Sequence, residues 1–224
     1  MRTSVIVPVL DEAVHIGPAL DALAGAGFAE VWVVDGGSAD GTPDLARARG
    51  AAVLHAPRGR AAQMNAGAAR ATGDVLLFLH ADARLPPGAA GLITQALQPP
   101  EVVGGAFTLR TVPERRRHAP WLRLADLRSR YTRAPYGDQA LFVRAEVFRR
   151  VGGFAELPLM EDLDLSLRLR REGPLARIRR DVRVSGRRFE ARPVFYGVFM
   201  NVAPLLFRAG VPADRLARWY GRVR

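Results

Sequence analysis

The sequence predicts an α/β fold with a central, mostly parallel sheet flanked by helices. Strand and helix patterns alternate four times between Thr3 and Leu109, with short connections. Strand–helix–strand units of this kind form parallel sheets with right-handed crossovers. The chain of 224 residues is long enough for one generous α/β domain and short for two.

Each predicted element has its own local signal. The first strand, Thr3–Leu10, is rich in β-branched residues, and the helix of about Ala13–Ala24 stops at the glycines that follow it. The later elements show the same apolar periods and glycine or proline boundaries. The predicted strands are Glu30–Val34, Ala51–His55, Val75–Leu79, Val102–Leu109 and a short one ending at Val143. One predicted helix begins at Thr42 and another ends at Ala69. Three more predicted helices span Pro87–Leu97, Ala145–Val151 and Met160–Leu169.

The run Val75–Leu79 is apolar throughout, as expected of a central parallel strand covered on both faces. It is followed by His80 and Asp82, and ligands of open α/β sheets bind beyond the carboxyl ends of the strands. A carboxylate there can hold a divalent cation and, through it, a substrate diphosphate. The alternative is that Asp82 only caps the turn before Pro86.

Composition narrows the classes of function. The chain has no cysteine, which excludes a disulfide framework, a zinc–thiolate site and a cysteine nucleophile and fits a reducing compartment. The net charge of +11 comes from arginine alone and favours anionic partners, namely sugar nucleotides, lipid phosphates or nucleic acid, although coding bias explains it equally. The apolar start of the chain leads straight into Asp11 and predicts a first strand, not a signal peptide.

Acidic residues also begin the predicted helix Met160–Leu169. Glu161 and Asp162 lie in its first turn, where the helix dipole favours negative charge. That placement explains both residues without catalysis, so the pattern alone leaves a catalytic role open.

The segment Pro193–Arg208 is apolar nearly all round. It is too short and too interrupted for a confident transmembrane span. Flanking arginines suit a helix lying in an anionic membrane surface, whereas packing against the domain or a dimer partner explains the pattern equally well.

Five motifs occur together in one order along residues 3–170. They are Ser4–Glu12 with Pro8 inside it, Val33–Thr42 with Asp35-Gly36-Gly37-Ser38, Asn65-Ala66-Gly67, Leu79–Asp82, and Gly152-Gly153-Phe154 followed by Glu161-Asp162. Together they resemble a family 2 glycosyltransferase of the GT-A fold, in a bacterial branch with a His-Ala-Asp variant of the Asp-x-Asp motif.

The resemblance implies a nucleotide-sugar donor bound at the strand ends, and it favours a UDP-sugar. The residues that it assigns to donor binding are Pro8, Leu10, Glu12, Asp35, Gly36, Gly37, Ser38, Arg58, Arg60, Gln63, Asn65, His80, Ala81 and Asp82. Asp82 is the implied ligand of Mn²⁺ or Mg²⁺. Because His80 replaces the first aspartate of the motif, it either coordinates manganese or contacts the ribose or phosphates.

The resemblance also implies an inverting reaction. Asp162 would act as general base toward an acceptor hydroxyl, Glu161 would orient it, and Asp138 would lie near the acceptor. Arginines pair phosphates through two hydrogen bonds, so the candidates for the leaving diphosphate are Arg58, Arg60, Arg187 and Arg188.

The expected organisation is one domain over 1–190, with a nucleotide-sugar half at 1–110 and an acceptor half at 111–190, and a helical segment at 191–224. We expect a cytoplasmic protein that binds the inner face of the membrane or forms a homodimer. The competing interpretations are a sugar-nucleotide nucleotidyltransferase, disfavoured by the absence of lysine and of its glycine-rich loop, and a non-catalytic basic module for membranes or nucleic acid. The few aromatic residues argue against nucleic-acid binding.

Overall fold

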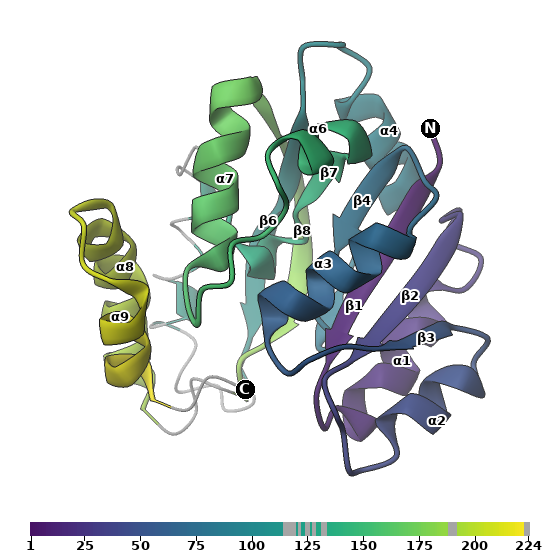
Figure 1. The fold of residues 1–224 in the computed structure, drawn as a ribbon, viewed down its shortest axis with the longest axis horizontal. Coiled ribbons are helices and arrows are strands. Elements are labelled where there is room, and N and C mark those ends of the chain that lie inside the picture. The colour runs from purple at the N-terminus through teal and green to yellow at the C-terminus, as the bar shows by residue number, and fades with distance from the viewer. Residues whose placement is uncertain are drawn as a thin grey trace.

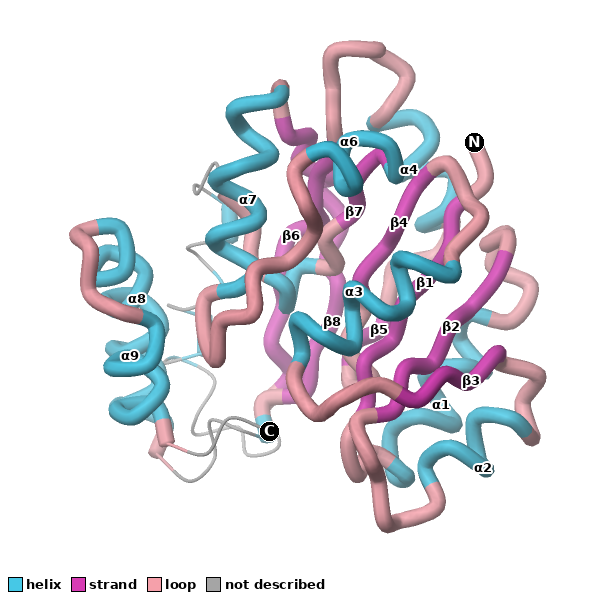
Figure 2. Tube along the Cα trace, viewed as in Figure 1, coloured by secondary structure: helices cyan, strands magenta, loops and turns pink. Residues whose placement is uncertain are grey.

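The computed structural model shows a mixed sheet with helices on both faces (Figures 1 and 2). It describes residues 1–113, 120, 122, 123, 126, 129, 130, 134–187 and 192–221. Arg188, predicted to contact phosphate, therefore lies outside the described residues.

The elements agree closely with the predicted spans through residue 112, except that the short strand β5 was not predicted. The strands are β1 (Thr3–Val9), β2 (Glu30–Asp35), β3 (Ala52–His55), β4 (Val75–Phe78), β5 (Ala83–Arg84), β6 (Gly104–Val112), β7 (Phe142–Arg144) and β8 (Leu175–Ser185). The helices are α1 (Ala13–Leu23), α2 (Thr42–Arg47), α3 (Arg60–Arg70), α4 (Ala89–Ala96), α6 (Ala145–Arg150), α7 (Glu161–Glu172), α8 (Pro193–Arg208) and α9 (Ala213–Tyr220), with a 3₁₀ turn at Gly137–Gln139.

The strand order is β3-β2-β1-β4-β7-β6-β8-β5. Strands β1 to β4 pair in parallel, and so do β6 and β8, which confirms a mostly parallel sheet. The short strand β7 is antiparallel and lies between β4 and β6, so β6 does not extend the first half directly. Gly104 permits this close approach, since a Cβ atom there would lie 2.6 Å from the carbonyl oxygen of Phe142.

Strand β8 was not predicted from the sequence. Five of its eleven residues are arginine or aspartate on exposed or half-buried positions, and only Ile178 and Val182 are buried. That sparse apolar content gives little alternation for a sequence pattern to detect. Pairing with β6 stabilises the strand instead.

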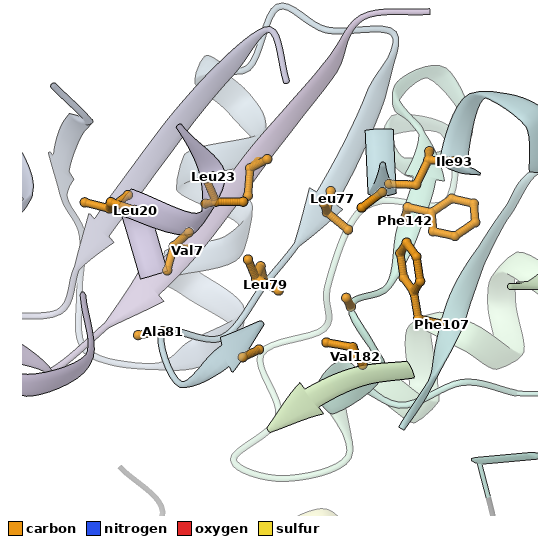
Figure 3. Packing of buried hydrophobic residues seen from close by; sticks show 14 of the residues in the cluster. Val7, Leu20, Leu23, Leu77, Leu79, Ala81, Ile93, Phe107, Phe142 and Val182 are labelled. Atoms are coloured by element: carbon orange, nitrogen blue, oxygen red, sulfur yellow. The ribbon is translucent and has the colours of Figure 1, made fainter. Parts of the chain in front are cut away.

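The two faces of the sheet carry separate cores. Val5, Val7 and Leu77 pack beneath α1 and α4, as Figure 3 shows for Leu20, Leu23 and Ile93. The alternate residues of the same strands, including Ile6 and Leu76, pack beneath α3, α6 and α7. Because β4 is apolar on both faces, it ends in a well-fixed position at the carboxyl edge of the sheet.

Helices α8 and α9, here called the C-terminal hairpin, lie beside α7 at one end of the molecule (Figure 1). Phe199 and Ala203 are buried against Leu159 and Leu163, so one face of α8 packs on the domain. The opposite face carries exposed apolar residues. Among the described residues, no helix is both long enough and apolar enough to cross a bilayer.

Candidate active site

Two adjoining pockets lie at the carboxyl ends of β1 and β4, and they share Arg60, His80 and Asp82. The strand-end pocket is lined by Pro8, Val9, Leu10, Glu12, Arg60, Gln63, His80, Ala81 and Asp82. The hairpin pocket is lined by Arg60, His80, Asp82, Leu109, Thr111, Tyr136, Asp138, Leu159, Met160, Glu161, Asp162, Val184, Ser185, Met200, Pro204 and Tyr220. The structure thus brings Asp82 and Asp162 to one pocket although 80 positions separate them.

A turn rather than the strand itself presents His80 and Asp82. Strand β4 ends at Phe78, and the amide of Ala83 donates to the carbonyl oxygen of His80 at 3.0 Å. The amide of Ser185 donates to the carbonyl oxygen of Asp82 at 3.3 Å, which ties this turn to the end of β8. Both residues therefore lie beyond the end of β4, as expected, and both side chains line both pockets.

Arg187 bridges the two carboxylates of the strand-end pocket. Its Nη2 lies 2.6 and 2.7 Å from the two carboxylate oxygens of Glu12, and its Nε lies 3.5 Å from Oδ2 of Asp82. Both acids are largely buried, whereas a quarter of the Arg187 side chain is exposed. A guanidinium at this place, between the ends of β1 and β4, is suited to pairing with phosphate.

Arg60 occupies the boundary between the pockets. It is the first residue of α3, and its Nη1 lies 3.4 Å from Oε1 of the buried Glu161. Burial lowers the pKa of Arg60, but the charges of Glu161, Asp162, Tyr220 and Asp138 outweigh that effect and raise the pKa above its ordinary value. The guanidinium therefore stays charged and compensates the acids around it.

Asp162 is held in place by two backbone amides. Gly137 N–H donates to its Oδ2 at 2.6 Å, and Leu163 N–H donates to its Oδ1 at 2.7 Å. A Cβ atom on Gly137 would lie 3.2 Å from that Oδ2 and 3.5 Å from Nε2 of His80, so both side chains border the same glycine. The absence of a side chain at Gly137 lets the imidazole and the carboxylate approach each other.

Backbone strain is concentrated around these pockets. Among the described residues, the non-glycine residues with positive φ are Asp11, Ala140 and Met160, at 51°, 52° and 68°. Each follows or precedes a segment that contributes to a pocket: β1, the 3₁₀ turn and the start of α7. Such conformations cost about 1–3 kcal/mol each and cluster at functional sites.

The Asp35 loop follows β2 and is organised by its own carboxylate. Gly37 N–H donates to Asp35 at 2.9 Å, and both the amide and the hydroxyl of Ser38 donate to it as well. Burial raises the pKa of Asp35, but these hydrogen bonds and His55 outweigh it and hold the pKa below its ordinary value. Asp35 therefore shapes the loop that includes Gly36, while its direct contact with a nucleotide stays a prediction.

Three other residues were predicted to bind the donor. Two of them, Gln63 and Asn65, form hydrogen bonds within the fold, and Arg58 lines a different groove. Gln63 donates from Nε2 to the carbonyl oxygens of Val9 and Val34, at 2.8 and 2.7 Å, and joins β1 to β2. Asn65 exchanges two hydrogen bonds of 2.9 Å with the backbone of Phe154, so two of the five sequence motifs contact each other. Arg58 lines a separate groove beside Arg60, with Glu156 and Glu161.

The donor set around Asp82 fits a divalent cation that is held largely by its substrate. No group of three or more histidine, cysteine or acidic side chains suited to a metal is found within the described ranges. Magnesium-type sites commonly use one or two carboxylates and complete their coordination with substrate phosphates and water. Asp82, with His80 beside it, meets that requirement.

Most of the hairpin-pocket wall was not predicted from the sequence. Leu109, Tyr136, Ser185, Met200 and Tyr220 come from five separate segments. Only the i, i+4 spacing of Met200 and Pro204 on an apolar helix is a detectable local signal. Packing of the hairpin against the domain brings the others together.

Comparison with solved structures supports the fold assignment. A mannosyltransferase from Pyrobaculum calidifontis, solved with GDP-Man and Mn²⁺, matches with a TM-score of 0.66 at 21% identity over 98% of this chain and 68% of that one. Glucosyl-3-phosphoglycerate synthase from Mycobacterium tuberculosis, solved with Mn²⁺, UDP and phosphoglyceric acid, matches with a TM-score of 0.64 at 20% identity over 94% and 79% of the two chains. Mannosyl-3-phosphoglycerate synthase from Rubrobacter xylanophilus matches with a TM-score of 0.60 at 19% identity over 94% and 75%.

The curated proteins contain no sequence match to this chain. The sequence model of the family described as glycosyl transferase family 2 matches residues 4–156, which is more than half of the chain. The matched residues include four of the five motifs in full and Gly152-Gly153-Phe154 of the fifth, but not Glu161-Asp162. The predicted GT-A fold is confirmed, and the chain belongs to glycosyl transferase family 2 as a glycosyltransferase.

Proposed function

We propose that this enzyme transfers a sugar from a UDP-sugar to an acceptor hydroxyl with inversion at the anomeric carbon. The meeting of Asp82 and Asp162 in the hairpin pocket, with Arg60 and His80 beside them, is the observation that carries the proposal. Solved relatives with the same fold contain UDP or GDP-Man together with Mn²⁺. Family membership favours this function over the nucleotidyltransferase and the non-catalytic module.

Each half of the reaction has its own residues. Asp162 takes the proton of the acceptor hydroxyl while that oxygen bonds to the sugar C1, and Glu161 supports the arrangement through Arg60. The bond from C1 to the diphosphate oxygen breaks, and its electron pair leaves with the diphosphate. Arg187 and Arg60 stabilise the charge that develops there. Mn²⁺ or Mg²⁺ held by Asp82 and His80 would supply further positive charge to the leaving group.

The pockets follow the proposed division of the chain. Every residue that lines the strand-end pocket belongs to 1–110, which we assign to the donor. The segments that complete the hairpin pocket come from 111–190 and from the C-terminal hairpin, which we assign to the acceptor.

A donor panel tests this function. We expect UDP-sugars to raise the melting temperature in the presence of Mn²⁺ more than GDP- or dTDP-sugars do. The stabilising donor should then release its nucleotide in a metal-dependent reaction, and proton NMR of the product should show the inverted anomer. Absence of nucleotide release from every donor, with and without Mn²⁺, would contradict the proposal.

We further propose that the C-terminal hairpin lies on an anionic membrane at the inner, cytoplasmic face. Val194, Val198, Val202 and Leu205 form one stripe along α8 and are 42–63% exposed. Arg192 and Arg208 are exposed at the two ends of this helix. An apolar stripe between basic residues is typical of helices that bind the interface of anionic bilayers.

Vesicle sedimentation tests the membrane proposal. The wild-type protein should sediment with phosphatidylserine vesicles at low salt, and replacing Val198 and Leu205 together by glutamine should abolish this. Val14→Gln on α1 is the matched control, because Val14 is 79% exposed but lies outside the hairpin. Equal sedimentation of the double variant and the wild type would refute the proposal.

A further inference from the structure

Titratable and apolar side chains line the hairpin pocket together, along with Thr111 and Ser185. The titratable residues are His80, Asp82, Asp138, Glu161 and Asp162, besides Arg60. The apolar surface comes from the sheet, from the segment before α7 and from the hairpin: Leu109, Leu159, Val184, Met200, Pro204 and the ring of Tyr220. An acceptor that places its hydroxyl at Asp162 therefore has its body against hydrocarbon.

The charge of the pocket disfavours an anionic acceptor. Asp138, Glu161 and Asp162 lie on the acceptor side, and the arginine that lines this pocket among the described residues is Arg60. Arg60 is already paired with Glu161 and interacts with Asp138 and Asp162. Among the described residues, a phosphate or carboxylate on the acceptor would therefore compete with the donor diphosphate for Arg60 and otherwise meet carboxylates.

We propose that the acceptor is an uncharged alcohol carried on a hydrocarbon body. Its hydroxyl contacts Asp162, and its apolar part contacts Met200, Pro204 and Tyr220. This inference rests on the glycosyltransferase function proposed above and specifies the substrate class of the same site.

The side chain of Met200 is the part of the hairpin-pocket lining that an acceptor can displace most easily. The pocket encloses about 90 Å³, which is below the roughly 300–1,000 Å³ of most ligand pockets, so an acceptor has to displace side chains. The ring of Tyr220 packs against Tyr196 and Phe199 at centroid distances of 5.4 and 5.5 Å. Met200, with its flexible unbranched side chain, is the residue that can move most easily.

The same helix has a second apolar face turned to the outside. Val202 lies on this face two residues from Met200 and is 42% exposed. A hydrocarbon-bearing alcohol can thus come from solution or from a membrane under the hairpin, and the two sources share one pocket chemistry.

Equilibrium binding of simple alcohols tests the inference. The full-length protein with saturating UDP and Mn²⁺ is titrated by NMR with 1-butanol, 1-pentanol and 1-hexanol, and with glycerol and glycerol 3-phosphate as polar and anionic probes. Each added methylene should tighten binding about fourfold, as expected for burial of hydrocarbon. Glycerol and glycerol 3-phosphate should bind more weakly than every alkanol.

Two variants locate the binding. Met200→Gln keeps the length of the side chain but puts an amide into the apolar wall, and it should weaken 1-hexanol binding at least about fivefold. Val202→Gln changes the outer face of the same helix and should leave 1-hexanol binding unchanged. UDP affinity should be equal in both variants.

The outcomes separate this inference from the donor proposal. Tighter binding of glycerol 3-phosphate than of 1-hexanol, or an equal effect of the two variants, would overturn the acceptor class while UDP and Mn²⁺ binding persisted. If the wild-type protein did not bind UDP at all, the proposed donor function would be refuted instead. A competition experiment with diacylglycerol in phosphatidylserine vesicles distinguishes the two sources of the alcohol. If the acceptor comes from the membrane, vesicles with diacylglycerol should displace 1-hexanol, whereas vesicles without it should not. If the acceptor comes from solution, both kinds of vesicle should leave 1-hexanol binding unchanged.

Discussion

Replacing Asp162 by asparagine tests the proposed base with the smallest change of shape. Asparagine keeps the side-chain volume but cannot take a proton from the acceptor. Loss of a general base typically slows a reaction by roughly 10²–10⁴-fold. We therefore expect nucleotide release in the presence of acceptor to fall by that factor, while UDP affinity stays within about twofold of the wild type.

The structure also gives the stability cost of this substitution. The two carboxylate oxygens of Asp162 accept from Gly137 and Leu163 at 2.6 and 2.7 Å, and asparagine can accept at only one of these places. The unsatisfied amide costs about 1–3 kcal/mol of unfolding free energy. For a chain of this size that corresponds to a fall of roughly 2–12 °C in melting temperature, so activity must be measured well below the transition.

Asp164→Asn is the matched control for Asp162→Asn. Asp164 lies in the same first turn of α7 but pairs with Arg168 at 2.7 Å and does not line the hairpin pocket. Loss of this i, i+4 pair costs only about 0.3–0.5 kcal/mol. Calorimetric UDP binding and nucleotide release should both match the wild type. A rate of Asp162→Asn within tenfold of the wild type, or an equal loss in Asp164→Asn, would show that Asp162 is not the base.

Three further changes test other parts of the site. Asp82→Ala should abolish the gain in UDP affinity that Mn²⁺ gives, at least about tenfold or 1.4 kcal/mol, and calorimetry showing no effect of a chelator on the wild type would contradict the metal assignment. Asn65→Ala removes both hydrogen bonds to the Phe154 backbone and should lower the melting temperature by roughly 5–15 °C, with UDP affinity retained by the folded protein. The pKa of Asp35 is lower in the folded than in the unfolded protein, so its stabilising contribution is complete above the ordinary value of 3.8 and disappears as the pH falls through the folded value. Urea unfolding should therefore show a smaller acid-induced loss of stability in Asp35→Asn than in the wild type; equal losses would refute this role.

The elements of residues 1–110 follow from sequence patterns because their signals are local. Runs such as Thr3–Val9 and Val75–Phe78 show their strands by apolar content alone. The loop at Asp35 shows its role through glycine and serine at fixed offsets from one carboxylate. The side chains of Gln63 and Asn65 join backbone segments of the fold, a role that the sequence motif did not indicate. Their binding of the donor stays a prediction.

The sequence by itself determined the fold class and the family motifs, because hydrophobic period and turn chemistry act over a few residues. The resemblance to the family, not the period, singled out Asp162, and the roles of Asp82 and Asp162 stay predictions. Tertiary structure decided the antiparallel insertion of β7, the pairing of β8 and the wall formed by the C-terminal hairpin. Arg187 shows the reason most clearly. It meets Glu12 across 175 positions only because β8 pairs with β6 and ends beside the Asp82 turn. Such contacts depend on complementary surfaces of distant segments, which no local pattern encodes.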